Sequence, residues 1–175
     1  MEIILIGFLA FVFLKSKAEN SIDTSSNFIL PTKDFLQSLQ EKYNTYIYSA
    51  LDQWNVSIEP EIIIGMISTE SKGNEFSLGD NGKSYGLLQI QQKAFNEVYN
   101  FQIDNGLSVF DNTITNLYNP SVNIFVGIGY LKYLMENEGY SLQDAIQAYN
   151  TGTVGTKAGT DYLNKVLSCK NILIS

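Results

Sequence analysis

Hydrophobic side chains recur every three or four residues along much of the chain, which is the spacing of one face of an α-helix. Such a stripe covers residues 35–54 and predicts a first helix that packs across the core. Its hydrophobic positions are Phe35, Leu36, Leu39, Tyr43, Tyr46, Ile47, Ala50, Leu51 and Trp54. Patterns typical of strands are few, so the fold is expected to be mainly α.

Local signals for helix ends predict further helices. Glu59-Pro60-Glu61 puts proline at a helix start, where acidic side chains interact favourably with the positive end of the helix dipole. This helix is expected to reach Gly73, which is suited to cap its end. Ser141 is suited to cap a helix that runs through Tyr149, and Thr160 is expected to begin a short last helix. After Gly73, residues 74–85 are polar and contain turn residues, which predicts a loop or a short hairpin.

Pro120 is expected to open another helix, whose hydrophobic face carries residues spaced by four, three and four. These residues are Ile124, Ile128, Leu131 and Met135. Gly127 and Gly129 lie in the same segment. Because glycine has no side chain, we expect them to let a neighbouring backbone approach the helix closely.

Glu70 falls on the hydrophobic face that Ile63, Met66 and Ile67 define in the second helix. Burial disfavours the charged form of a carboxyl group and raises its pKa. An unpaired Glu70 would therefore be a proton donor near neutral pH. Alternatively, the side chain reaches solvent at the helix end or pairs with Lys72.

The chain begins with a hydrophobic run, residues 3–14, between Glu2 and the pair Lys15 and Lys17. This run is shorter than the ~20 residues that span a bilayer, and Ser16-Lys17-Ala18 could be a cleavage site. The interpretations are a cleaved signal, a retained membrane anchor or a buried segment. We therefore expect a hydrophobic segment over residues 1–18, a polar linker over 19–33 and one folded domain over 34–175.

Composition limits the chemistry, because the 175 residues include no histidine and no arginine. A Ser-His-Asp triad or a Cys-His pair cannot be built, and a zinc site would depend on carboxylates and the single Cys169. No metal or other cofactor is expected. A net charge of −7 makes nucleic acid an unexpected partner. Cys169 is interpreted as a small packing residue of the last helix.

Four short motifs follow one another along the chain. They are Glu70-Ser71, Gly86-Leu87-Leu88-Gln89-Ile90, Ala148-Tyr149-Asn150 with Gly152, and Tyr162 ahead of Val166-Leu167. Together with Asn119-Pro120, Asn123-Ile124 and Tyr130-Leu131, they resemble in order the family 1 (SLT-type) lytic transglycosylases of the lysozyme-like superfamily. The resemblance covers residues 60–167 and implies a single domain like that of goose-type lysozyme.

The resemblance implies a role for each matching residue. Glu70 would be the acid that protonates the glycosidic oxygen and then the base, and Tyr162 would orient it. The remaining positions would contact the substrate. They are Ser71, Gly86, Leu87, Leu88, Gln89, Tyr149 and Asn150.

The segment from Ser77 to Tyr85 departs from the family pattern. Its Gly-Asp-x-Gly-x-Ser-x-Gly wording is also similar to animal-type lysozymes and makes Asp80 a candidate second carboxylate. A glycosidase that uses water directly normally needs two carboxyl groups. The other interpretation of Asp80 is a turn residue that bonds to its own backbone.

The resemblance implies cleavage of the β-1,4 bond between N-acetylmuramic acid and N-acetylglucosamine in peptidoglycan, with a 1,6-anhydro product. The alternatives are a lysozyme that uses Asp80 and water, and a non-catalytic wall-binding protein. The protein is expected to be exported or membrane-anchored through residues 3–14 and to act on the cell wall. Its setting could be a phage, a secretion or conjugation apparatus, or wall turnover.

Overall fold

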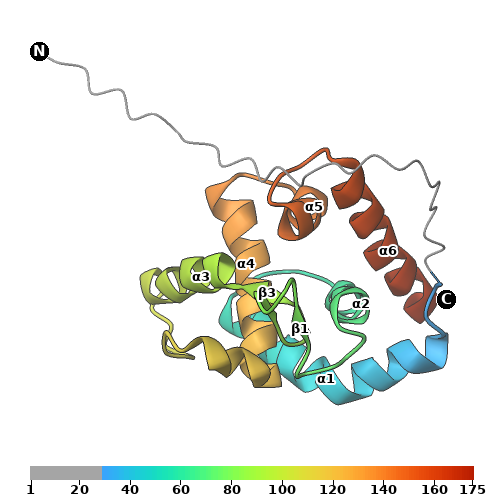
Figure 1. Ribbon diagram of the computed structural model, residues 1–175, viewed down its shortest axis with the longest axis horizontal. Helices are drawn as coiled ribbons and strands as arrows, with labels where there is room; N and C mark the ends of the chain where they lie inside the picture. The colour runs from blue at the N-terminus through green and yellow to red at the C-terminus, as the bar shows by residue number, and fades with distance from the viewer. Residues whose placement is uncertain (1–28) are drawn as a thin grey trace, which may run out of the picture.

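The computed structural model describes residues 29–175, which form a mainly helical domain (Figure 1). The helices are α1 (Lys33–Gln53), α2 (Pro60–Glu70), α3 (Gln92–Asp104), α4 (Pro120–Asn137), α5 (Leu142–Thr151) and α6 (Lys157–Ile174), with a 3-10 helix η1 (Ile114–Tyr118). The strands are β1 (Leu78–Gly79), β2 (Ser84–Tyr85) and β3 (Ile90–Gln91). The expected helical fold class is therefore confirmed.

The hydrophobic run at residues 3–14, interpreted as an anchor or signal, lies outside the described residues. Within residues 29–175, none of the helices has the length and hydrophobicity needed to cross a bilayer.

The first helix buries the face that the stripe predicts. Thr32 caps its start, because the Thr32 hydroxyl accepts a hydrogen bond from the backbone N–H of Phe35 at 3.2 Å. Trp54 follows its end and donates its indole N–H to the Phe125 carbonyl at 2.9 Å. Tyr46 departs from the expectation, because it lies at the edge of the stripe and remains 40% exposed.

The second helix forms the centre of the domain. Residues 62–68 are all buried, and Figure 1 shows α2 nearly end-on between α1 and α6. The helix ends at Glu70 rather than Gly73. The expected end is wrong because the backbone turns left-handed at Lys72 and Gly73, with φ of 53° and 77°. A side chain on Gly73 would also lie 2.5 Å from the Leu39 side chain.

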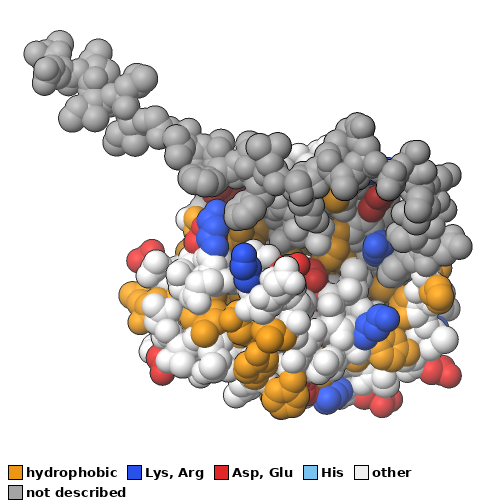
Figure 2. All heavy atoms as spheres, in the orientation of Figure 1, with side chains coloured by type: hydrophobic (Ala, Val, Ile, Leu, Met, Phe, Trp, Pro, Cys, Tyr) orange, Lys and Arg blue, Asp and Glu red, His pale blue; other side chains and the backbone are white. Residues whose placement is uncertain are grey.

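The hairpin expected between residues 74 and 85 is confirmed. Strands β1 and β2 pair antiparallel, with Leu78 opposite Tyr85, and β3 extends the sheet on the other side of β2. Figure 2 shows hydrophobic side chains gathered where the sheet and η1 lie in this view. Phe76 and Leu78, which are 71% and 55% exposed, belong to this part of the chain.

Two expectations about the later helices need correction. Gly127 and Gly129 accommodate side chains rather than a backbone: a Cβ there would lie 2.3 Å from Leu88 and 2.5 Å from Trp54, respectively. The last helix begins at Lys157 and has 18 residues, because Thr156 caps it by accepting from the Gly159 N–H at 3.0 Å.

Candidate active site

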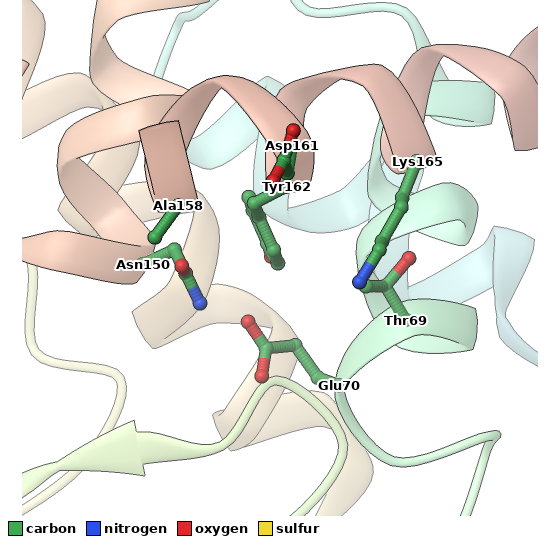
Figure 3. Close-up of a pocket in the computed structure, with 7 residues that line it drawn as sticks. All are labelled: Thr69, Glu70, Asn150, Ala158, Asp161, Tyr162 and Lys165. Carbon is green, nitrogen blue, oxygen red and sulfur yellow. The ribbon is translucent and has the colours of Figure 1, made fainter. Parts of the chain in front are cut away.

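Glu70 is the last residue of α2 and faces a pocket of about 360 Å³ (Figure 3). One wall is the end of α2, and the other walls are the end of α5 and the first turns of α6. The lining residues are Thr69, Glu70, Asn150, Ala158, Asp161, Tyr162 and Lys165. The fold thus brings together three predicted site residues, Glu70, Asn150 and Tyr162, from segments far apart in the chain.

The surroundings of Glu70 raise the pKa of its carboxyl from 4.5 to about 7. Burial is the largest cause, the nearby Tyr162 hydroxyl opposes the shift, and the negative charge of Asp80 adds to it. The protonated form therefore persists to near-neutral pH. Within the described chain, no ion pair joins Glu70 to Lys72, which was the alternative interpretation of this side chain.

Tyr162 projects from α6 into the pocket, and Figure 3 shows its ring directed towards Glu70. The residue is only 5% exposed. Its hydroxyl makes no well-formed hydrogen bond with the described residues, although it lies close enough to lower the pKa of Glu70. Burial and the Glu70 charge raise the pKa of Tyr162 well above its ordinary value, so the phenol stays protonated.

Asn150 and Tyr149 have different positions despite being neighbours in sequence. Asn150 lines the pocket, with its side-chain amide directed towards the Glu70 carboxyl (Figure 3). Tyr149 is not among the lining residues, and its hydroxyl donates to the Leu88 carbonyl at 2.8 Å. Tyr149 therefore connects α5 to the segment that follows β2.

The residues Gly86-Leu87-Leu88-Gln89, which the resemblance places at the substrate, are not among those that line the pocket. Leu87 and Leu88 are 1% and 0% exposed, so both side chains belong to the core. Gly86 has a φ of 71°, and a Cβ there would lie 2.3 Å from the side chain of Asn123. Glycine at this position therefore leaves space for the Asn123 amide. The Gln89 amide donates to the carbonyls of Ser77 and Gly86 at 3.2 and 2.8 Å and stabilises the hairpin.

Asn123 of α4 holds the segment after β2 in place, a role that was not predicted from the sequence. It is fully buried. Its carbonyl oxygen accepts from the Leu88 N–H at 2.9 Å, and its amide donates to the carbonyls of Tyr85 and Leu117 at 2.9 and 2.8 Å. The only signal was its occurrence in the Asn123-Ile124 part of the family pattern.

Asp80 and Ser71 are not among the residues that line the pocket. Asp80 is exposed in the turn between β1 and β2, and its carboxylate accepts from the side chains of Ser84 and Gln91 at 2.6 and 3.1 Å. It thus bonds to side chains rather than to its own backbone. Ser71 caps the end of α2, where its hydroxyl donates to the Ile67 carbonyl at 3.3 Å.

Four lining residues were missed in the sequence: Thr69, Ala158, Asp161 and Lys165. The three on α6 share a face with Tyr162, and the spacing would have indicated them had the helix start been placed at Lys157. Asp161 pairs with Lys157 at 2.7 Å. Among residues 29–175, the Cys, Asp and Glu side chains form no group of three or more that could hold a metal ion.

Comparisons with known proteins identify the family of the chain. A sequence model of the family described as "Transglycosylase SLT domain" matches residues 45–165, which contain Glu70, Asn150 and Tyr162. The chain is also 27% identical over 130 residues to a protein of Enterobacteria phage PRD1 named "Transglycosylase". That match covers 73% of this chain but only 42% of the phage protein. Because the family match extends over most of the chain, the protein belongs to the Transglycosylase SLT domain family.

Proposed function

We propose that the protein is a peptidoglycan lytic transglycosylase in which Glu70 is the single acid/base. The observation that carries this proposal is the position of Glu70 at the end of a buried helix, in a pocket where its pKa is about 7. A donor works best when its pKa lies near the working pH. The "Transglycosylase SLT domain" match supports the same reaction class.

In the proposed reaction, Glu70 gives its proton to the glycosidic oxygen between N-acetylmuramic acid and N-acetylglucosamine. The bond from this oxygen to the muramic C1 breaks, and the muramic acetamido group assists the departure. The Glu70 carboxylate then takes the proton of the muramic 6-hydroxyl while that oxygen bonds to C1. The product is a 1,6-anhydro ring, no water is consumed, and Glu70 recovers its proton.

The neighbours of Glu70 suit this role. Tyr162 faces the carboxyl and would orient it, because its buried hydroxyl lacks another well-formed hydrogen bond among the described residues. The Asn150 amide points towards the same carboxyl and can hydrogen-bond to a sugar. Both groups are neutral, so they do not prevent Glu70 from alternating between its two protonation states.

A hydrolytic reaction with Asp80 as second carboxylate is the alternative. Asp80 is close enough for its charge to raise the pKa of Glu70. However, the Asp80 carboxylate is bonded to Ser84 and Gln91 and does not line the pocket. A non-catalytic wall-binding protein, the other alternative, would not need a buried carboxyl with a raised pKa. We therefore favour the transglycosylase.

The similarity to a phage protein favours a phage setting over a secretion apparatus or wall turnover. In that setting the enzyme would open the cell wall during entry or release. Residues 3–14 would hold it at a membrane, as their hydrophobicity suggests.

The test of the proposed acid is Glu70→Gln, assayed on purified peptidoglycan sacculi by loss of turbidity. Glutamine keeps the shape of the side chain but cannot donate a proton, so we expect activity to fall by about 10²–10⁴-fold. The control is Glu41→Gln on the exposed face of α1, which should be as active as the wild type. Near wild-type activity of Glu70→Gln, with an unchanged circular dichroism spectrum, would exclude Glu70 as the acid.

A further inference from the structure

The pocket wall formed by α6 carries a positive charge that the proposed reaction does not use. Lys165 lies three residues after Tyr162 on the same face of the helix, and Figure 3 shows its ammonium directed into the pocket near Thr69. It is the only lysine among the described residues that line this pocket. The acidic lining residue on α6, Asp161, is already paired with Lys157 at 2.7 Å.

The other polar side chains of this wall already have roles. The Tyr162 hydroxyl faces Glu70, and the Thr69 hydroxyl donates to the Gly65 carbonyl at 2.8 Å, so its proton is not available to a ligand. An ammonium has three N–H donors, so Lys165 can bind a ligand while it also contacts the protein.

We infer that Lys165 binds a carboxylate which the substrate carries on the sugar next to the scissile bond. The inference rests on the proposed function, because it takes that sugar to be N-acetylmuramic acid. This sugar bears a lactyl ether that ends in a carboxyl group, whereas N-acetylglucosamine bears none. The carboxylate could be the free lactyl group of a peptide-free strand, or it could belong to a stem peptide attached there.

The charges around Lys165 fit an anionic substituent. The proposed reaction begins with Glu70 protonated, so the acid itself is neutral when substrate binds. Asp161, which also lines the pocket, forms an exposed ion pair with Lys157. The protein as a whole carries a net charge of −7, so a positive charge directed into its pocket is suited to discriminate among glycans. Lys165 would thus determine specificity rather than take part in bond cleavage.

The test measures glycan binding to the full chain carrying Glu70→Gln, which keeps the pocket but should not cleave its ligand. Three probes are compared by calorimetry: a peptide-free muramic-acid tetrasaccharide, the same tetrasaccharide with stem peptides, and neutral chitotetraose. Adding Lys165→Met should weaken binding of an anionic probe by about tenfold, the scale of a lost charge-assisted hydrogen bond. Chitotetraose binding should not change, and Lys165→Arg should restore most of the lost affinity.

The pattern of losses identifies the carboxylate. A loss confined to the peptide-free probe indicates the lactyl carboxylate, because the stem peptide converts this group to an amide. A loss confined to the peptide-bearing probe indicates a carboxylate of the stem peptide. The matched control is Lys93→Met, which changes an exposed lysine of α3 and should leave the affinity for every probe unchanged. Equal weakening of chitotetraose, unchanged binding of every probe, or no binding of any probe would overturn the inference. Because binding is measured without turnover, failure of wild-type cleavage would contradict the proposed function separately.

Discussion

At the residue scale, the protonation of Glu70 depends on groups from three different segments. Burial at the end of α2 raises its pKa, Asp80 in the hairpin turn raises it further, and Tyr162 of α6 lowers it. The raised pKa means that the donor form persists up to about pH 7. Glu70 can therefore donate a proton under conditions where an exposed glutamate would be ionised.

The pH profile of wall cleavage should report this pKa. Activity should fall as pH rises through about 7, because Glu70 then loses the proton that it must donate.

Asp80→Asn should move this alkaline limb to lower pH, because removing a nearby negative charge makes ionisation of Glu70 easier. Asparagine keeps an oxygen that can accept from Ser84, so the hairpin should remain folded. The profile is measured as initial turbidity loss between pH 4 and 9.

A limb near the ~4.3 of a free glutamate would mean that Glu70 is solvated in the working enzyme. A limb near 7 that stays in place in Asp80→Asn would mean that burial alone sets the value.

The individual site residues were only partly predictable from sequence. Glu70 was placed correctly because its position on a hydrophobic helical face already indicates burial. Leu87 and Leu88 were assigned to substrate contact because their motif marks the family, yet both side chains pack in the core. A motif in one sequence does not distinguish residues that bind substrate from residues that hold the binding segment in place.

At the element scale, the crossing of α2 and α6 sets the distance between Glu70 and Tyr162. A Cβ on Gly65 of α2 would lie 2.7 Å from the Val166 carbonyl oxygen and 3.2 Å from the Cys169 Cβ on α6. The nearer atom belongs to the backbone, so it cannot turn aside as a flexible side chain could. Gly65 therefore permits an approach between the helices that any other residue would prevent.

Gly65→Ala should reduce the turnover number of wall cleavage more than tenfold, because α6 must move and carry Tyr162 with it. Overpacking should also cost about 1–3 kcal/mol of stability. The matched control is Gly129→Ala, which overpacks the core against Trp54 and lies outside the pocket. Turnover is measured well below both melting temperatures, so that each variant is folded. Equal losses of turnover in the two variants would show that the α2–α6 crossing has no special role.

Some of the helices were easier to predict from the sequence than others. The helices that begin at Pro60 and Pro120 and the helix that Ser141 caps were predicted from proline and serine at helix starts, and the structure confirms these positions. The helix α3 was not predicted, although Ala94, Phe95, Val98 and Phe101 recur at helical spacing. Its buried face ends in Gln102, whose amide bonds to Phe110 and Val109, and a buried polar residue with such partners cannot be recognised from the hydrophobic pattern.

At the scale of the whole molecule, the described residues bury an extensive hydrophobic core. This core extends from Leu36 in α1 to Cys169 in α6. Cys169 is fully buried, as expected of a small packing residue. Residues of all six helices contribute to it. The candidate active-site pocket lies between three of these helices, so its geometry depends on the folded domain as a whole.

A truncated chain that begins at Pro31 should be folded and active. This start keeps Thr32, which caps α1, whereas a chain starting at Lys33 should be less stable by about 1 kcal/mol. Both chains should retain the helical circular dichroism spectrum and cleave soluble glycan strands at the wild-type rate. Aggregation or loss of cooperative unfolding in the Pro31 chain would mean that the preceding segment packs on the domain.

In the proposed reaction Glu70 works alone, and the attack on the anomeric carbon comes from within the substrate. Mass spectrometry of sacculi digested by the wild-type protein distinguishes this reaction from hydrolysis. We expect muropeptides that end in 1,6-anhydromuramic acid, which are lighter than hydrolysis products by one water and resist borohydride. Asp80→Asn should yield the same products. Products that consist mainly of reducing ends, together with inactivity of Asp80→Asn, would contradict the account and identify the protein as a lysozyme.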